Sequence, residues 1–253
     1  MSVAACADLV ERGDADRFAA VMAAPAGLRA RLWPLYAFNL EIARAPWVTK
    51  EPMIAEMRLQ WWRDVVAETT PRAHEVAGPL HDLIKAARLD VGILEQMAAA
   101  RVWDIYAEAF EDQAAFDLYL DQTAGGLMWL AARVSGADPR AEAVVRDYGW
   151  AAGLAAFLRA VPVLEERGKR PLVDGRPGAV RDLAARGLEK IRAARAGRHL
   201  VGKAAPALLA GWQAEALLRQ VVADPMVVAE GRMGLSEFAR RGRLLWQGVS
   251  GRY

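Results

Sequence analysis

Hydrophobic residues recur at helical spacing along nearly the whole chain. Apolar side chains return every three or four positions, and the strict alternation of a half-buried strand is almost absent. Alanine, leucine and arginine, which all favour helix, dominate these stretches, and breakers such as "AAPAG", "SGADPR" and "DGRPGA" separate them. The pattern predicts an all-α protein with helices over residues 3–12, 15–23, 27–45, 52–68, 76–87, 91–110, 113–135, 140–167, 179–197, 204–222 and 234–248.

Two of the expected helices, 27–45 and 148–164, are apolar nearly all round. A helix without a polar face belongs at the centre of a bundle. No linker is long enough to divide the chain, and no repeat of fixed period is present. We therefore expect residues 1–253 to form one all-α domain in which amphipathic helices surround the central ones. Bundles of this kind often hold ligands between facing central helices.

The composition excludes several classes of function. The net charge of the 253 residues is only +2, and basic residues are spread along the chain, which does not favour nucleic-acid binding. Cys6 is the single cysteine, so we expect no disulfide framework and no cysteine-based zinc site. The first residues lack a basic signal-peptide region, and no charge-free run approaches the roughly 20 residues of a membrane-spanning helix. We expect a cytoplasmic protein without a cofactor.

Acidic residues and histidines elsewhere offer no metal centre by their spacing. Asp117 and Asp121 stand four residues apart, a pattern common on exposed helices, and we interpret them as solvated. His74, His81 and His199 lack the spacing of metal ligands, and we expect them at the surface.

The helix expected over 52–68 contains two adjacent tryptophans in "EPMIAEMRLQWWRDVVAE". Arg58 precedes Trp61 by three positions and Trp62 by four, so its guanidinium can lie along an indole ring. The simplest interpretation is that both tryptophans anchor core packing. The alternative is that one is core and the other, with Arg58, borders a ligand cavity.

Several segments together resemble the squalene/phytoene synthase family. The segments "DRFAAVMAAP", "LYAFNLEIAR", "EPMIAEMRLQWWRD", "YLDQTAGGLMWLAA" and "YGWAAGLAAFLRAVP" follow the order and spacing of that family over about residues 14–172. The resemblance implies an all-α isoprenoid-synthase fold with a central cavity, and enzymes of the family join two prenyl diphosphates head to head. The runs "NLEIA" and "RLQWW" look most like the branch that holds mitochondrial complex I assembly factor 6 and its bacterial relatives.

Enzymes of this family hold magnesium through aspartates on two facing helices, because the departing diphosphate needs hard cations on its oxygens. The resemblance places the first aspartate site at Ala43, Arg44 and Trp47 of this chain. The second site follows Leu158 and Arg159, and the corresponding positions form an apolar stripe: Gly153, Ala156, Ala160 and Leu164. None of these side chains coordinates magnesium. We therefore predict no metal site and no catalytic residue.

Glu41 is an acid in this apolar neighbourhood, and it lies outside the aspartate register. It can pair with Arg44 or with Arg58 of the next helix, as buried acids usually require a cationic partner. Alternatively, it can contact a ligand head group or a partner. The candidate pocket or partner contacts are Tyr36, Asn39, Glu41, Arg58, Trp61, Trp62, Asp64 and Arg159.

Three hypotheses of function follow. The first is a non-catalytic binding or assembly protein that assists the biogenesis of respiratory complex I, contacts its subunits or assembly intermediates, and can hold an apolar prenyl-like molecule. It includes peripheral contact with the inner membrane. The second is a divergent prenyltransferase in which Arg44, Arg58 and Arg159 grip diphosphate. The third is a structural helical module whose cavity is filled.

Overall fold

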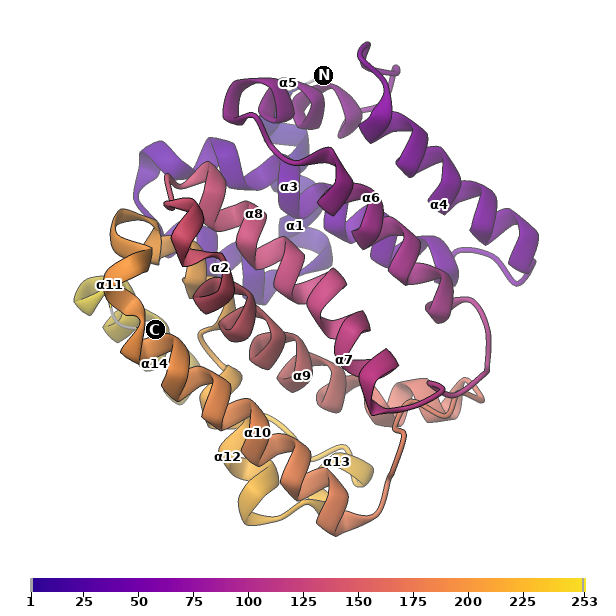
Figure 1. Ribbon diagram of the computed structural model, residues 1–253, viewed down its shortest axis with the longest axis vertical. Helices are drawn as coiled ribbons and strands as arrows, with labels where there is room; N and C mark the ends of the chain where they lie inside the picture. Colours follow the sequence, from indigo (N-terminus) through magenta and orange to yellow (C-terminus); the bar gives the residue numbers. More distant parts are fainter. Residues whose placement is uncertain (1, 252) are drawn as a thin grey trace.

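The computed structural model describes residues 2–251 and 253, and its helices follow the expected segments closely (Figure 1). The α-helices are α1 Val3–Gly13, α2 Ala15–Ala23, α3 Ala26–Arg44, α4 Pro52–Ala67, α5 Ala77–Ala87, α6 Val91–Ala100, α7 Gln113–Leu120, α8 Gly126–Val134, α9 Glu142–Glu166, α10 Pro177–Ala196, α11 Arg198–Val201, α12 Ala214–Ala223, α13 Met226–Ala229 and α14 Glu237–Ser250. The shorter 3₁₀ elements are η1 Ala45–Trp47, η2 Arg101–Asp104, η4 Pro139–Ala141 and η5 Gly202–Gly211, and η3 Asp121–Gly125 is a π-helical segment. No strand occurs in the described residues, which confirms the all-α prediction.

Local chemistry explains where many of these helices begin. Short polar side chains accept a hydrogen bond from a backbone N–H of the first turn, which satisfies a donor that the helix itself leaves free. These N-cap residues are Ser2, Asp14, Asp90, Asp112 and Ser236. Proline begins α4 and α10, where its missing N–H costs nothing.

Three predicted helices differ from the observed ones. The helix predicted over 91–110 ends at Ala100, tightens into η2 and gives way to a loop. The helix predicted over 113–135 contains the π segment η3. The helix predicted over 204–222 is split, because η5 contains Pro206 and α12 begins only at Ala214.

The two helices predicted to be central are central. The α3 side chains from Leu32 to Ile42 are buried except for Glu41, and α9 is buried along most of its length. In Figure 1, α8 and α9 cross the middle of the molecule, with α4 and α6 on one side and α10 and α12 on the other. The observed arrangement is the single-domain bundle that the apolar pattern predicted, with the central cavity that the family resemblance implied.

Two glycines of α9 allow a close approach to the π segment. A Cβ atom at Gly153 would lie 2.4 Å from the Cβ of Ala124. A Cβ atom at Gly149 would lie 2.9 Å from the carbonyl oxygen of the same alanine. Any side chain at these positions would separate α9 from η3. The two glycines therefore set how closely α9 and η3 approach each other beside the cavity.

No helix in residues 2–251 and 253 combines the length and hydrophobicity needed to cross a bilayer.

Candidate functional site

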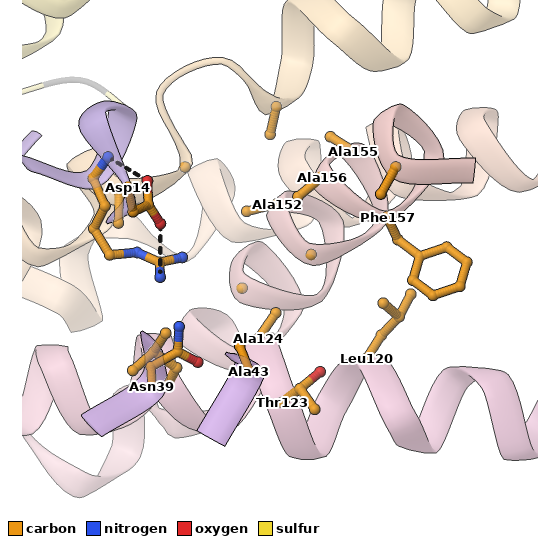
Figure 2. Close-up of a pocket in the computed structure, with 18 of the residues that line it drawn as sticks. Asp14, Asn39, Ala43, Leu120, Thr123, Ala124, Ala152, Ala155, Ala156 and Phe157 are labelled. Carbon is orange, nitrogen blue, oxygen red and sulfur yellow. Dashed lines mark hydrogen bonds and ion pairs between the residues drawn. The ribbon is translucent and has the colours of Figure 1, made fainter. Parts of the chain in front are cut away.

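A cavity of about 360 Å³ lies between α3 and α9. Its other walls come from the α7–η3–α8 segment and from the connection of η5 to α12. Figure 2 shows side chains from several of these elements around the open space. Most of the lining is apolar, with Leu127, Met128, Phe157 and Leu217 among its larger side chains. Small-molecule sites in helical proteins usually have this form, an apolar cavity with a few polar groups.

The positions that the resemblance assigns to metal ligands surround this cavity. Ala43 of α3 and Trp47 of η1 line it. The α9 stripe at Gly153, Ala156, Ala160 and Leu164 lines it as well. Arg44 does not line the cavity, and its side chain is exposed. Trp47 has the Arg167 guanidinium 4.5 Å from its ring centroid, so this part of the wall carries an aromatic ring and a cation.

Three carboxylates line the cavity, and each forms an ion pair with an arginine that lines it too. The pairs are Asp14 with Arg17 at 3.1 Å, Asp16 with Arg159 at 3.2 Å and Asp104 with Arg101 at 3.0 Å. Among the described residues, no group of three or more histidine, cysteine, aspartate or glutamate side chains is arranged to hold a metal ion.

Asp14 and Asp16 are held by several donors. Asp14 accepts the backbone N–H of Arg17 at 2.9 Å as well as its guanidinium (Figure 2). Burial acts to raise the pKa of Asp16, but hydrogen bonds from Gln213 and Arg240 and the charge of Arg159 hold that pKa below its ordinary value. Both carboxylates are therefore neutralised within the protein and are poor ligands for a further cation.

Polar groups of α3 remain available to a ligand. Tyr36 is buried, lines the cavity and has the Arg17 guanidinium 5.1 Å from its ring centroid. Burial raises the pKa of Tyr36 to about 12, so its phenol stays protonated and can donate a hydrogen bond. Asn39 also lines the cavity, and its side-chain amide has no hydrogen bond to any described residue. Its amide is the polar group most free to bind a ligand.

A second polar cluster lies at the cavity wall formed by η2 and α7. Arg101 donates to Asp104 at 3.0 Å and to the Tyr119 hydroxyl at 2.9 Å, and that hydroxyl donates to Asp104 at 3.0 Å. Nearby, Lys169 donates to the Trp103 carbonyl at 3.2 Å. Burial raises the pKa of Tyr119, and burial lowers the pKa of Lys169. Sequence reasoning missed this cluster, although the three-residue spacing of Arg101 and Asp104 in a helical stretch was a signal for their ion pair.

The structure brings only some of the predicted contact residues to the cavity. Tyr36, Asn39 and Arg159 line it. The other predicted contacts are not among the lining residues: Glu41, Arg58, Trp61, Trp62 and Asp64. Their role in binding a ligand or a partner stays a prediction, and the structure places Arg58, Trp61 and Trp62 outside the lining of this cavity.

The twin tryptophans pack on the core and on the loop after α4. Trp62 is 3% exposed and meets Phe38 edge to face at 5.5 Å. Trp61 is half-buried, packs on His74 at 5.3 Å, and has the Arg72 guanidinium 5.6 Å from its ring centroid. The loop thus supplies the cation that the sequence led us to expect from Arg58.

Glu41, Arg58 and Asp64 differ in their surroundings. Arg58 is exposed and has no ion pair or cation–π contact with any described residue. Glu41 is half-buried and forms no ion pair with either arginine proposed for it. Asp64 accepts a hydrogen bond from Gln60 at 2.7 Å.

Arg58→Ala is expected to leave the free energy of unfolding unchanged to within about 0.5 kcal/mol, because an exposed side chain without partners contributes little to stability. Urea titration followed by circular dichroism measures the change. The same titration of Glu41→Ala and of the double variant should show no coupling between the two positions. A coupling energy above about 0.5 kcal/mol would contradict the observed separation of these side chains.

Two minor predictions also change. Asp117 pairs with Arg186 of α10 at 2.5 Å, and Asp121 pairs with Arg146 of α9 at 3.2 Å, so these acids link helices instead of standing free in solvent. His81 is buried, with Nε2 3.2 Å from the Glu68 carbonyl, whereas the sequence placed it at the surface.

The chain is similar to proteins of one family over most of its length. The family model described as squalene/phytoene synthase matches residues 10–174. The NADH dehydrogenase (ubiquinone) complex I, assembly factor 6 homolog of Drosophila melanogaster is 29% identical over 168 residues, which are 62% of this chain and 50% of that protein. The human complex I assembly factor 6 is 26% identical over 168 residues, 65% of this chain and 50% of that protein. The chain therefore spans about half the length of the curated relatives it matches.

Solved structures show the same fold at low sequence identity. A crystal structure of a dehydrosqualene synthase in complex with ligand superposes with a TM-score of 0.80 at 13% identity, over 98% of this chain and 95% of that one. Squalene synthase HpnC from Alicyclobacillus acidocaldarius superposes with a TM-score of 0.73 at 15% identity, over 92% of this chain and 95% of that one. The bundle around the cavity is thus the fold of these synthases.

Proposed function

Because the chain belongs to the squalene/phytoene synthase family, we propose that it is a non-catalytic member that acts as a binding or assembly protein in the biogenesis of respiratory complex I. It works without a cofactor and contacts complex I subunits or assembly intermediates. Peripheral contact with the inner membrane is part of the proposal.

The main support for the proposed loss of catalysis is that every described carboxylate lining the cavity is paired with an arginine. Condensation of two prenyl diphosphates concentrates negative charge in a site of low dielectric constant, and divalent cations normally offset that charge. The lining at Ala43, Trp47, Ala160 and Leu164 offers no carboxylate to such cations. Asp14, Asp16 and Asp104 are already neutralised, so the cavity lacks the anionic centres that magnesium requires.

The assembly role is supported by the relatives. The fly and human proteins, at 29% and 26% identity, are named for the assembly of complex I. The family model covers α3, α4 and α9. The cavity supports a ligand with a long apolar part, because its walls are mostly aliphatic and aromatic and the polar groups are few. Asn39 and Tyr36 would hold the polar end of a prenyl-like molecule.

Calorimetry tests the absence of a metal site. Titration of the protein with magnesium in the presence of a non-hydrolysable diphosphate analogue is expected to give no metal-dependent heat. Titration of a catalytically active squalene synthase under the same conditions is the positive control. A metal-dependent signal with micromolar affinity would contradict the proposal, and carboxylates outside the three arginine pairs would then have to bind the ion.

Product analysis separates the proposal from its alternative, a divergent prenyltransferase. The overall fold shared with dehydrosqualene synthase is the observation that favours that alternative. Incubation with farnesyl or geranylgeranyl diphosphate and magnesium is expected to yield no condensed hydrocarbon. Formation of squalene, dehydrosqualene or phytoene above the level of a heat-denatured sample would overturn the proposal.

Recovery of complex I subunits on immobilised protein would distinguish an assembly factor from a structural module with no partner.

A further inference from the structure

The last long helix, α14, exposes its apolar side. The exposed fractions are 89% for Phe238, 69% for Leu245, 63% for Trp246 and 81% for Val249. These residues follow one another at spacings of seven, one and three positions, so they lie on one stripe of the helix. We call this set the α14 stripe. Four large apolar side chains on one helix form a patch of a kind that usually marks an interaction surface.

The opposite side of α14 attaches the helix to the protein through polar groups. Gln247 is buried, and its Nε2 donates to the Trp212 carbonyl at 3.3 Å. Arg240 forms an ion pair with Asp16 of α2. Leu244 packs against the small cluster that contains Trp212. The orientation of α14 is therefore fixed by specific contacts, and the apolar stripe is held outward by them.

Basic residues border the α14 stripe. At 100° per residue, Arg241 lies on one edge of the stripe, next to Leu245, and Arg243 lies on the other, next to Trp246. Arg241 is 85% exposed and only 3.6 Å from Glu237, the single acid of the helix. An apolar stripe with aromatic residues and flanking arginines is the pattern of a helix that lies in the interface of a membrane.

A basic pocket of about 530 Å³ adjoins the same helix. Arg195, Arg198 and Arg243 line it together with Trp246 and Tyr253. Among the described lining residues the acidic side chain is Glu215, which is already paired with Arg195 at 2.6 Å and with Arg219 at 2.7 Å, and Arg195 also donates to the Tyr253 main-chain oxygen.

Three polar groups of this pocket are uncompensated. Arg198 and Arg243 have no ion pair with any described residue. The hydroxyl of Tyr253, a residue only 6% exposed, is buried and has no hydrogen-bond partner among the described residues. Two arginines without an acidic partner are the donors that a phosphate group prefers.

We propose that α14 binds the surface of an anionic phospholipid bilayer, with the α14 stripe among the acyl chains and a lipid phosphate in the basic pocket. Trp246 belongs to both features, so the apolar and the anionic parts of one surface meet at the same residue. A second copy of the chain fits less well, because a symmetric contact through the stripe would bring Arg241 and Arg243 of both copies together with few acids to offset them. The inference extends the membrane contact within the proposed function and does not depend on the loss of catalysis.

Vesicle sedimentation tests the proposal with the full chain. Wild-type protein is expected to bind vesicles of phosphatidylcholine with phosphatidylglycerol at least about tenfold more tightly than vesicles of phosphatidylcholine alone. Leu245→Ser with Trp246→Ser should weaken binding to the anionic vesicles about tenfold or more, because the apolar contact is lost. Arg198→Gln with Arg243→Gln should remove the preference for anionic lipid, and Arg198→Lys with Arg243→Lys should retain most of it.

Matched controls remove similar groups elsewhere. Met53→Ser with Met57→Ser replaces two exposed apolar residues of α4, and Lys50→Gln with Lys85→Gln removes two exposed charges. Both controls should bind as wild type, and all variants should keep the wild-type circular dichroism melting curve.

Several results would overturn the proposal. One is equal binding of the wild-type protein to neutral and anionic vesicles. Another is unchanged vesicle binding by the variant with Leu245→Ser and Trp246→Ser. A third is a wild-type dimer in light scattering that the same double substitution abolishes. The last result would assign the stripe to a second copy. Failure of vesicle binding would leave the product analysis unaffected, so the two proposals fail separately.

Discussion

Replacement of Trp62 by alanine is expected to lower the free energy of unfolding by about 3–5 kcal/mol, the usual cost of deleting a large buried aromatic side chain. The indole is 3% exposed, and it contacts Phe38 of α3 and His74 of the loop after α4. Its loss would leave a cavity between the central helix and α4, and the surrounding side chains can fill such a cavity only in part. Guanidinium chloride titration followed by circular dichroism measures the change.

Trp61→Ala is the matched control, because Trp61 is the neighbouring residue on the same helix but is only half-buried. Its substitution should cost less, about 1–2 kcal/mol. Neither substitution should alter ligand binding in the central cavity, since neither side chain lines it. Equal losses at both positions would show that the loop after α4 is packed as firmly as the core, and a Trp62→Ala variant of wild-type stability would contradict the packing observed here.

Asp104→Ala is the second substitution with a large expected effect, a loss of about 3–5 kcal/mol. Asp104 is 4% exposed and accepts from both Arg101 and Tyr119. Without it the guanidinium of Arg101 would remain buried with no carboxylate, and the cost of an unpaired buried charge exceeds that of a lost neutral hydrogen bond. Thermal and chemical denaturation of the purified variant measure the loss.

A double-mutant cycle identifies the cause of that loss. Arg101→Leu with Asp104→Leu should be more stable than the sum of the two single substitutions predicts, because the double variant leaves neither charge unpaired. Arg140→Ala is the surface control, since its pair with Asp138 is exposed, and it should leave the denaturation midpoint unchanged. Additive effects at 101 and 104 would contradict the ion pair as the source of stability.

The bundle around the cavity superposes on a dehydrosqualene synthase, whereas the lining carboxylates are each bound to an arginine. Under the proposed function, the apolar walls bind the apolar part of an isoprenoid, and the cations that the condensation requires have no ligands. The proposal therefore assigns binding and catalysis to different side chains.

The pattern of apolar residues was sufficient to predict most of the fold. Helical spacing located nearly every helix, and the all-round hydrophobicity of 27–45 and 148–164 identified the two central ones. The prediction failed where the geometry of a helix changes without a change in its apolar spacing. The segment 121–125 forms a π helix, and Gly149 and Gly153 let α9 pack closely against it, a contact between elements distant in the chain.

The candidate site was predictable only in part. Tyr36, Asn39 and Arg159 lie on helices that the apolar pattern identified as central, and the structure places them in the cavity lining, where their role in binding stays a prediction. The cluster of Arg101, Asp104 and Tyr119 was missed, since η2 and α7 meet only after a loop reverses the chain. Arg58 was misplaced because a spacing of three or four residues permits a contact with an indole but does not require it.

The sequence by itself determined which segments are helical and which two helices are central. Those properties depend on the identity and spacing of neighbouring residues along one helix. Only the tertiary structure decided that the lining carboxylates are all paired with arginines and that α14 is attached by Gln247 and Arg240 with its apolar stripe outward. Those properties depend on the angle and rotation at which distant helices pack, and the amphipathic pattern of a helix alone does not specify which of its sides meets the rest of the protein.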